Sequence, residues 1–252
     1  VLSRWGCFRI PVFIDGVMDL SLVDLSRSSI RNDKSRVRAS GFTSEISHDL
    51  ELARWCYKEL YLPYAKEKYS GEEVVIRPEE LDRKDIKREV LFVKKGEDRV
   101  AGVVLYRQGK GVLFRFMGVR TPSQELLQAG VVQGLYLFLY NYVKEQGFAP
   151  ICFGGTRPFF KDGVLAFNKK WGLRLTCCSD KNMCLFRRNN TLGVKGFLIN
   201  NPFIALEGKD LVGMFFKGAM DPEEGRGCHE VKRWPGLKRV EVHRFGEMIR
   251  TH

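Results

Sequence analysis

The chain has 252 residues, which is enough for one large domain or two small ones. Hydrophobic residues make up 44% of the sequence and charged residues 29%, a composition that excludes a disordered chain. Lysine and arginine outnumber aspartate and glutamate by 42 to 30, so the net charge of +12 favours RNA, phosphate-bearing ligands or an anionic membrane surface as partners.

The first fifty residues predict a strand, a helix and a second strand. Arg9–Ile14 is predicted as an edge strand, where Pro11 is tolerated because it need not donate to a ladder. A polar helix rich in arginine follows over Leu22–Ser40 and is expected to end at Gly41. Phe42–Ser47 alternates polar and apolar residues as a strand does.

The middle of the chain predicts two helices and a three-stranded meander. Asp49 is placed to cap a helix whose apolar residues recur at helical spacing, and we expect Pro63 to end that helix. A short helix begins after Pro78. Three strands separated by glycine-containing turns follow: Glu89–Lys95, Arg99–Tyr106 and Val112–Val119.

A long helix, a short strand, a second helix and two strands complete the predicted elements. Ser123 is expected to cap the long helix, which ends near Glu145. Three amide side chains interrupt its most apolar stretch, Leu126–Val143, so we expect a buried helix of a cytoplasmic protein and no membrane span. The remaining elements are the strand Ile151–Phe153, the helix Asp162–Trp171, and the strands Leu173–Cys178 and Met183–Arg187, paired across a turn at Ser179–Lys181.

Cysteine and histidine spacing argues against disulfide bonds and metal. The seven cysteines are an odd number at irregular spacing, which does not suit a disulfide framework. Cys177, Cys178 and Cys184 lie close together, but they lack the paired C-x₂-C spacing of zinc sites. We therefore expect buried free thiols and no structural metal.

From Phe42 onward the order of elements is β-α-α-β-β-β-α-β-α-β-β, which resembles the topology of the GNAT acyltransferase fold. The resemblance implies an α/β (α+β) architecture with a mixed sheet flanked by helices. It also implies that this sheet is splayed between its fourth strand, Val112–Val119, and its fifth, Ile151–Phe153, where an acyl donor enters.

Local sequence motifs resemble the FemABX-like branch of the GNAT superfamily, which includes peptidoglycan-bridge aminoacyltransferases and acetyltransferase-like domains. The resemblance covers residues 25–188. The segments that carry it are Gly154–Phe159, Asp162–Val164 and Phe167–Gly172, with weaker support from Tyr61–Tyr64 and Ala39–Gly41.

The sequence departs from the pattern of this family in two places. Asn168 stands where family members usually carry lysine, and Lys169 lies one residue on, about 100° further round a helix. Gly118–Ser123 lacks the Q/R-x-x-G-x-G/A signature with which ordinary GNAT enzymes hold coenzyme A. Fem-type enzymes also lack this signature and use aminoacyl-tRNA.

The resemblance implies an acyl- or aminoacyltransferase with acyl-CoA, such as acetyl-CoA, or aminoacyl-tRNA as donor. The acceptor would be an amine on a small molecule or peptide, and tRNA would be a partner in the second case. We expect a GNAT-like domain over 26–188, preceded by a remnant of another unit or an extension over 1–25. A C-terminal extension over 189–252 is expected to pack on that domain.

Four residues are candidates for binding the phosphates of the donor. Arg157 and Gly155 follow the fifth strand, where glycine permits close approach of a ligand and arginine grips phosphate in a fork. Ser123 begins the long helix, whose first N–H groups attract anions, and Arg120 adds a charge beside it. The alternatives are a structural arginine at 157 and a plain helix cap at 123.

Further candidates lie elsewhere on the predicted fold. Arg31 on the basic helix is a candidate for donor or acceptor phosphate, against a solvent-facing arginine. Tyr64, Asp162 and Lys169 are weak catalytic candidates, against a core tyrosine, a helix cap and a surface lysine. No residue is identified as the catalytic base.

Two other functions remain open from the sequence. One is a non-catalytic GNAT-fold module that binds RNA or a protein, favoured by Asn168 and the missing base. The other is a basic nucleic-acid-binding domain unrelated to GNAT, for which Lys232–Trp234 and Lys238–Arg239 interleave charge with an aromatic ring.

Overall fold

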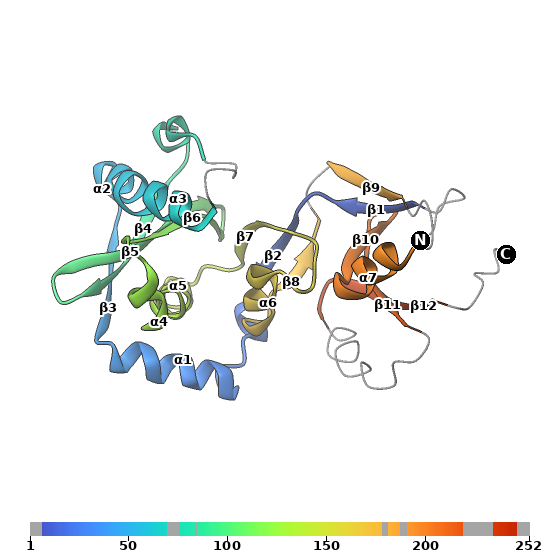
Figure 1. The fold of residues 1–252 in the computed structure, drawn as a ribbon. Helices are drawn as coiled ribbons and strands as arrows, with labels where there is room; N and C mark the ends of the chain where they lie inside the picture. Colours follow the sequence, from blue (N-terminus) through green and yellow to red (C-terminus); the bar gives the residue numbers. More distant parts are fainter. Residues whose placement is uncertain are drawn as a thin grey trace. The chain divides into compact units, whose positions relative to one another are not determined.

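The structure is a computed structural model (Figure 1). The chain forms two compact units: a central unit, Met18–Gly154, and a terminal unit that combines Val1–Val17 with Gly155–His252. This division differs from the predicted boundaries after residues 25 and 188. The residues that the structure describes are 7–69, 76–83, 85–177, 181–186, 191–218 and 234–245.

The central unit contains most of a mixed sheet and the helices that cover it. Its strands are β3 (Phe42–Ser47), β4 (Arg88–Lys95), β5 (Asp98–Gln108), β6 (Gly111–Val119) and most of β7 (Ile151–Thr156). Its helices are η1 (Leu20–Leu22), α1 (Ser28–Ala39), α2 (Leu50–Trp55), the π-helix η2 (Cys56–Tyr61), α3 (Leu62–Tyr69), η3 (Pro78–Asp82), α4 (Gln124–Gln128) and α5 (Val131–Glu145).

The terminal unit contains the remaining elements. Its strands are β1 (Cys7–Pro11), β2 (Ile14–Met18), β8 (Arg174–Thr176), β9 (Asn182–Phe186), β10 (Phe203–Glu207), β11 (Asp210–Lys217) and β12 (Leu237–Arg244), and β7 ends in this unit. Its helices are α6 (Gly163–Lys170) and α7 (Leu192–Asn200).

The largest sheet has seven strands in the order β3-β4-β5-β6-β7-β2-β8. Strands β3 to β6 pair antiparallel as a meander, and β6 pairs parallel with β7. The chain passes from the central to the terminal unit within β7, where the hydroxyl of Thr156 donates to the carbonyl oxygen of Ile14 on β2. The predicted mixed α/β fold with a helix-flanked sheet is therefore confirmed.

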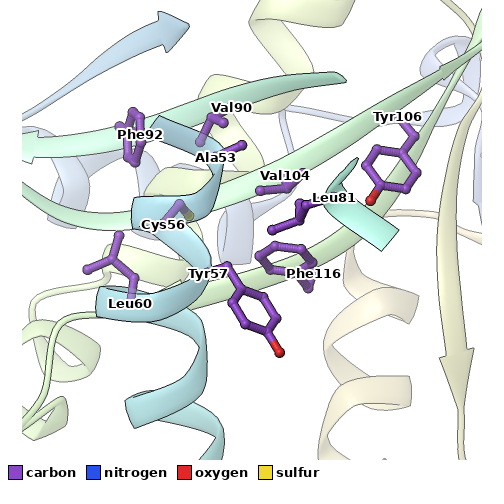
Figure 2. Close-up of a cluster of buried hydrophobic side chains, with 10 residues drawn as sticks. All are labelled: Ala53, Cys56, Tyr57, Leu60, Leu81, Val90, Phe92, Val104, Tyr106 and Phe116. Carbon is purple, nitrogen blue, oxygen red and sulfur yellow. The ribbon is translucent and has the colours of Figure 1, made fainter. Parts of the chain in front are cut away.

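A core of buried side chains lies between the meander and the α2–η2 helix (Figure 2). Apolar residues of the helix recur three or four positions apart and so share one face. Figure 2 shows that face turned toward side chains of β4, β5 and β6. The buried members are Ala53, Cys56, Tyr57, Leu60, Leu81, Val90, Phe92, Val104, Tyr106 and Phe116.

Helix α5 contacts strands β4 and β5, and α1 in turn packs on α5 (Figure 1). Val37 of α1 lies over Gly134 of α5, where the absence of a side chain lets the two helices approach. Among the described residues, no helix has the length and apolar composition needed to cross a membrane.

Two predicted helices of the central unit differ from the structure in where the helix is interrupted. Pro63 does not end its helix: the backbone widens to the π-helix η2 before it, and α3 continues through it. The wider turn accommodates a residue that lacks an N–H and whose ring would clash with the carbonyl four residues earlier. The predicted long helix is interrupted at Gly130, whose φ of 88° is left-handed, so α4 and α5 are separate helices.

The predicted hairpin over Leu173–Arg187 is also wrong. The two strands exist, but β8 pairs antiparallel with β2, and β9 pairs antiparallel with β1. Ser179 and Asp180 of the predicted turn lie outside the described residues. The predicted N-terminal strand is two strands, β1 and β2, and the predicted polar helix begins at Ser28 rather than Leu22.

A second sheet, β10-β11-β12, was not predicted from the sequence. Strands β10 and β11 pair antiparallel and β12 joins β11 in parallel. Its apolar side chains build the core of the terminal unit with Phe8 and Ile10 of β1 and Leu198 of α7. Of the predicted basic tail, Lys232 and Arg233 lie outside the described residues.

Candidate functional site

The parallel ladder between β6 and β7 is short. It consists of three pairs, Val112–Ile151, Leu113–Cys152 and Phe114–Phe153. Strand β6 continues five residues beyond the last pair, to Val119, with β5 alongside it on its other edge. In the part of the chain that the structure describes, no further β6–β7 pair forms, so the backbone of β6 leaves its β7 neighbour at Phe114.

A β-bulge lies at the point where this ladder ends. Val104 of β5 pairs with Phe116 and Leu105 pairs with Phe114, so Arg115 is an extra residue on β6. Because neighbouring residues of β5 point to opposite faces, Phe114 and Phe116 lie on opposite faces of the sheet. Bulges are frequent beside active sites because they redirect side chains and interrupt pairing.

Aromatic rings flank the bulge on both faces. On the α5 face, the centroid of Phe114 lies 5.9 Å from Tyr136 and 5.0 Å from Phe153, and these last two stack at 5.1 Å. On the other face, the ring of Phe116 lies 4.7 Å from that of Tyr61 and 5.7 Å from that of Tyr57. The end of the ladder is therefore held rigidly by packed rings.

Polar contacts anchor the segment before β4 to the same region. The guanidinium of Arg115 pairs with the carboxylate of Glu80 on η3. The hydroxyl of Tyr57 donates to the carbonyl of Ile76 at 2.7 Å, and Tyr61 accepts from the Ile76 N–H at 3.2 Å. Burial raises the pKa of Tyr57, which keeps this hydroxyl a donor.

Ser123 does not cap a helix, contrary to the prediction. Its own backbone is helical, and its side chain makes no capping hydrogen bond to α4. Instead, its amide and hydroxyl both donate to one carboxylate oxygen of Glu67, at 3.1 and 3.0 Å. A negative charge from α3 therefore already occupies the place where an anion was expected.

Arg120 directly follows β6, and its guanidinium has protein partners. One nitrogen lies 3.3 Å from the carboxylate of Asp98, and another donates to the carbonyl of Arg99 at 2.8 Å. These bonds tie the end of β6 to the start of β5. A role for Arg120 in binding the donor stays a prediction.

Arg31 and Tyr64 also belong to the central unit. Arg31 is exposed on α1. Tyr64 is buried at 5% exposure, and the ammonium of Lys68 lies 5.5 Å from its ring centroid, an arrangement that fits a core tyrosine. The expected end of the helix at Pro63, directly before Tyr64, is wrong, because α3 continues to Tyr69.

The candidates in the terminal unit occupy the end of β7 and helix α6. Arg157 is exposed. A Cβ at Gly155 would lie 2.6 Å from Cβ of Phe13, so this glycine makes room for a protein side chain. Asp162 caps α6, accepting from the amides of Val164 and Leu165 at 2.9 and 3.0 Å, as the alternative interpretation predicted.

The lysine-rich end of α6 is packed against the protein. Asn168, at the position where the family carries lysine, is 3% exposed. The ammonium of Lys169 lies 5.8 Å from the ring centroid of the buried Trp234. These surroundings fit structural roles for both side chains.

The predicted residues therefore fall into two groups. Arg31, Tyr64, Arg120 and Ser123 lie in the central unit, and Gly155, Arg157, Asp162 and Lys169 lie in the terminal unit. Within the first group, Arg120 and Ser123 follow β6 directly. The assignment of any of them to a ligand stays a prediction.

Sequence reasoning missed Arg115, Glu80 and Glu67, which define the surroundings of the bulge and of Ser123. No sequence pattern signals a bulge with one extra residue. A charge at Arg115 inside an otherwise apolar strand was the available signal. No group of three or more potential metal ligands gathers among the described residues.

Comparison with known proteins rests on structure alone, since no family model and no curated protein matches the sequence. A C-terminal domain of a putative lysylphosphatidylglycerol synthetase from Agrobacterium fabrum superposes with a TM-score of 0.51 at 15% identity, covering 68% of this chain and 60% of that one. With the strand order and short β6–β7 ladder, this superposition decides the fold. The chain has a GNAT-like fold.

Two further structures are similar over comparable shares of the chain. L-PGS from Bacillus licheniformis has a TM-score of 0.49 at 16% identity, covering 77% of this chain and 66% of that one. FemX has a TM-score of 0.46 at 15% identity, covering 65% and 59%. The chain thus spans 59–66% of the length of these three structures.

Proposed function

We propose that this protein transfers an acyl group from acyl-CoA or aminoacyl-tRNA to an amine on a small molecule or peptide. The observation that carries the proposal is the bulge at Arg115, where the β6–β7 ladder ends inside a GNAT-like sheet. The comparison structures support the fold of such a transferase. The identity of donor and acceptor belongs to the proposal.

The proposed reaction does not require a covalent bond between the protein and the substrate, because the donor is already activated. The amine nitrogen forms a bond to the donor's carbonyl carbon, the bond to the thiolate sulfur or ribose oxygen breaks, and the proton lost by the amine reaches the leaving group. Alignment of the two reactants can contribute about 7–11 kcal/mol in favourable cases. Donors preorganised around the developing oxyanion can add about 3 kcal/mol each.

The protein provides rigid elements for that alignment. A bulge leaves backbone groups outside the regular ladder, and packed aromatic rings on both faces hold this one in place. The candidates for contacting donor phosphates are Arg120 and Arg31 in the central unit and Arg157 in the terminal unit. The net charge of +12 favours both donors, because both are polyanions.

Calorimetry with coenzyme A, acetyl-CoA and bulk tRNA at two salt concentrations tests donor binding, and mass spectrometry of an amine acceptor tests transfer. We expect one donor class to bind saturably and to yield an acylated amine. Arg157→Ala should weaken donor binding at least tenfold with an unchanged melting temperature. Arg174→Ala, which removes another exposed arginine of the terminal unit, is the matched control.

A second candidate function is a GNAT-fold module that binds its ligand without turnover. The burial of Asn168 and the packing of Lys169 against Trp234 favour it, because neither side chain is then presented to a ligand. The same experiments separate the two functions. Saturable binding without any acylated product would contradict the transferase and support the module.

A further inference from the structure

One edge of α1 carries a row of basic side chains. Arg27, Arg31, Lys34 and Arg38 follow at spacings of four, three and four residues, which places them on one side of a helix. From Arg27 to Arg38 the row advances eleven residue steps, or roughly 16 Å at 1.5 Å per residue. We call these four residues the basic row.

The row is fixed in space by the buried side of the helix, which lies about a quarter turn away from it. Ile30, Asp33 and Val37 are buried, and Val37 packs over Gly134 of α5. Ser40, at the end of the helix, donates from its hydroxyl to the carbonyl of Ala129 at 2.9 Å. Since α1 cannot turn about its axis without breaking this packing, the four charges form a preorganised array.

The charges of the row are poorly neutralised by the protein. Arg27 lies 3.8 Å from the carboxylate of Asp24, but among the described residues no carboxylate lies within ion-pair distance of Arg31, Lys34 or Arg38. Seven arginines elsewhere do pair with carboxylates: Arg54, Arg83, Arg99, Arg107, Arg115, Arg120 and Arg239. Like charges at this spacing repel one another, so the row favours an external polyanion.

The neutral residues beside the row show what kind of polyanion fits. Besides basic residues, the exposed positions of α1 are Ser28, Ser29, Asn32, Ser35 and Ala39. A helix that docks on an anionic membrane inserts large apolar side chains, and α1 exposes none. Serine and asparagine beside arginine and lysine are the side chains that contact phosphates of nucleic acids.

We propose that the basic row of α1 is a docking surface for the phosphate backbone of RNA. The choice of RNA as the nucleic acid rests on the proposed function, in which aminoacyl-tRNA is one of the two donor classes. The row binds backbone phosphates without reading sequence. Three unpaired cations on one rigid helix should each displace a counterion when RNA binds.

The test compares two triple variants of the full chain in their binding of bulk tRNA between 50 and 200 mM salt. Arg31→Gln/Lys34→Gln/Arg38→Gln removes the unpaired charges of the row. Lys58→Gln/Lys95→Gln/Lys110→Gln removes the same total charge from three exposed lysines on separate elements. Circular dichroism checks that both variants fold, and single substitutions within the row replace the triple variant if it does not.

The row variant should lose roughly 2–3 units from the slope of log affinity against log salt, at about 0.7–0.9 per phosphate contact. Over this fourfold salt range the affinity of the unmodified protein should therefore fall roughly 20- to 40-fold more than that of the row variant. The tRNA affinity of the control variant should stay within about threefold of that of the unmodified protein. Equal losses of tRNA affinity in the row variant and the control variant would overturn the proposal. It would also be overturned if the row bound phosphatidylglycerol vesicles more tightly than tRNA.

Measuring acyl transfer separates this inference from the proposed function. Transfer from acetyl-CoA by a protein that does not bind tRNA would overturn the RNA surface and leave the transferase standing. Row-dependent tRNA binding without product from either donor would support the surface and contradict the transferase.

Discussion

Glu89 is a buried carboxylate, 3% exposed, at the start of β4, and it connects several elements of the central unit. Its oxygens accept from Nε of Arg107 at 2.6 Å and from the hydroxyl of Tyr142 at 2.7 Å. Nδ1 of His48 lies 3.7 Å away. Since a buried charge is costly without partners, these donors are needed to keep Glu89 in the fold.

The hydroxyl of Tyr142 should make stability depend on alkaline pH. Burial, and the hydrogen bond to Glu89, raise the pKa of Tyr142 to about 12 from its ordinary value of 10. The protonated tyrosine therefore stabilises the fold fully below pH 10, and this contribution is lost as pH rises toward 12. Tyr142→Phe should cost about 1–3 kcal/mol near neutrality, since Glu89 loses a donor, and should reduce the further loss between pH 9 and pH 11.5.

Urea denaturation at both pH values measures this effect. Tyr140→Phe removes a tyrosine hydroxyl from the same helix, so it is the control for the loss of a hydroxyl that does not bond to Glu89. An alkaline loss of stability in Tyr142→Phe as steep as in the unmodified protein would refute the assignment.

At the scale of elements, the contact of the π-helix η2 with β6 decides how the candidate site is built. Gly118 of β6 lies directly under the backbone of Leu60 and Tyr61. The rings of Tyr57 and Tyr61 then reach Phe116 beside the bulge. Two backbones approach closely here because one residue has no side chain.

Gly118→Ala should therefore destabilise the central unit strongly. A Cβ at this position would clash with the carbonyl carbon of Leu60 and the amide nitrogen of Tyr61, which are backbone atoms that cannot rotate away. We expect a loss of about 1–3 kcal/mol or more in the free energy of unfolding. Gly154→Ala, where a Cβ would meet nothing within 4 Å, should change stability little. A similar small effect for both variants in thermal denaturation would contradict the packing described.

Local patterns in the sequence predicted most elements of the central unit. The strand Phe42–Ser47 has the predicted limits, and the meander strands differ by a few residues at their ends. Asp49 and Asp162 cap their helices as predicted. These features depend on residues near in sequence: alternation, side-chain caps and glycine turns.

Features that depend on distant residues could not be predicted. Strand β9 looked like the partner of β8, but it pairs with β1, more than 170 residues earlier in the chain. Helix α3 continues through Pro63 because the π-turn of η2 accommodates the ring. The β10–β11 hairpin is an exception, because apolar residues on both sides of Gly208 are a local pattern typical of a hairpin.

The candidate site was predicted only in outline. The end of β6 beside β7 was the expected region, but the bulge at Arg115 is a property of pairing with β5, and a charge inside an apolar strand does not by itself predict a bulge. Glu67 reaches Ser123 across 56 residues, so a cap was the reasonable but wrong interpretation of Ser123.

At the scale of the whole molecule, one continuous segment and one divided segment make the two units. The central unit runs without interruption from Met18 to Gly154 and has its own core between the meander and η2. The terminal unit needs both β1 and β9, which lie more than 170 residues apart in the chain and pair with each other.

The segment 18–154 should fold when expressed alone. We expect cooperative unfolding in urea and retention of the salt-dependent tRNA binding by the basic row, since α1 and α5 are both present. The matched fragment 155–252 lacks β1 and β2 and should not unfold cooperatively. A segment 18–154 that gives only a broad, non-cooperative transition would show that its core is insufficient.

The pairing of β1 with β9 has a consequence for synthesis on the ribosome. Phe8 and Ile10 are synthesised more than 170 residues before their partner strand. At 5–20 residues per second, translation takes roughly 10–35 s to cover that distance. Throughout this interval the apolar side chains of β1 lack their partner strand while the central unit is synthesised, so β1 is paired only after the whole central unit has been made.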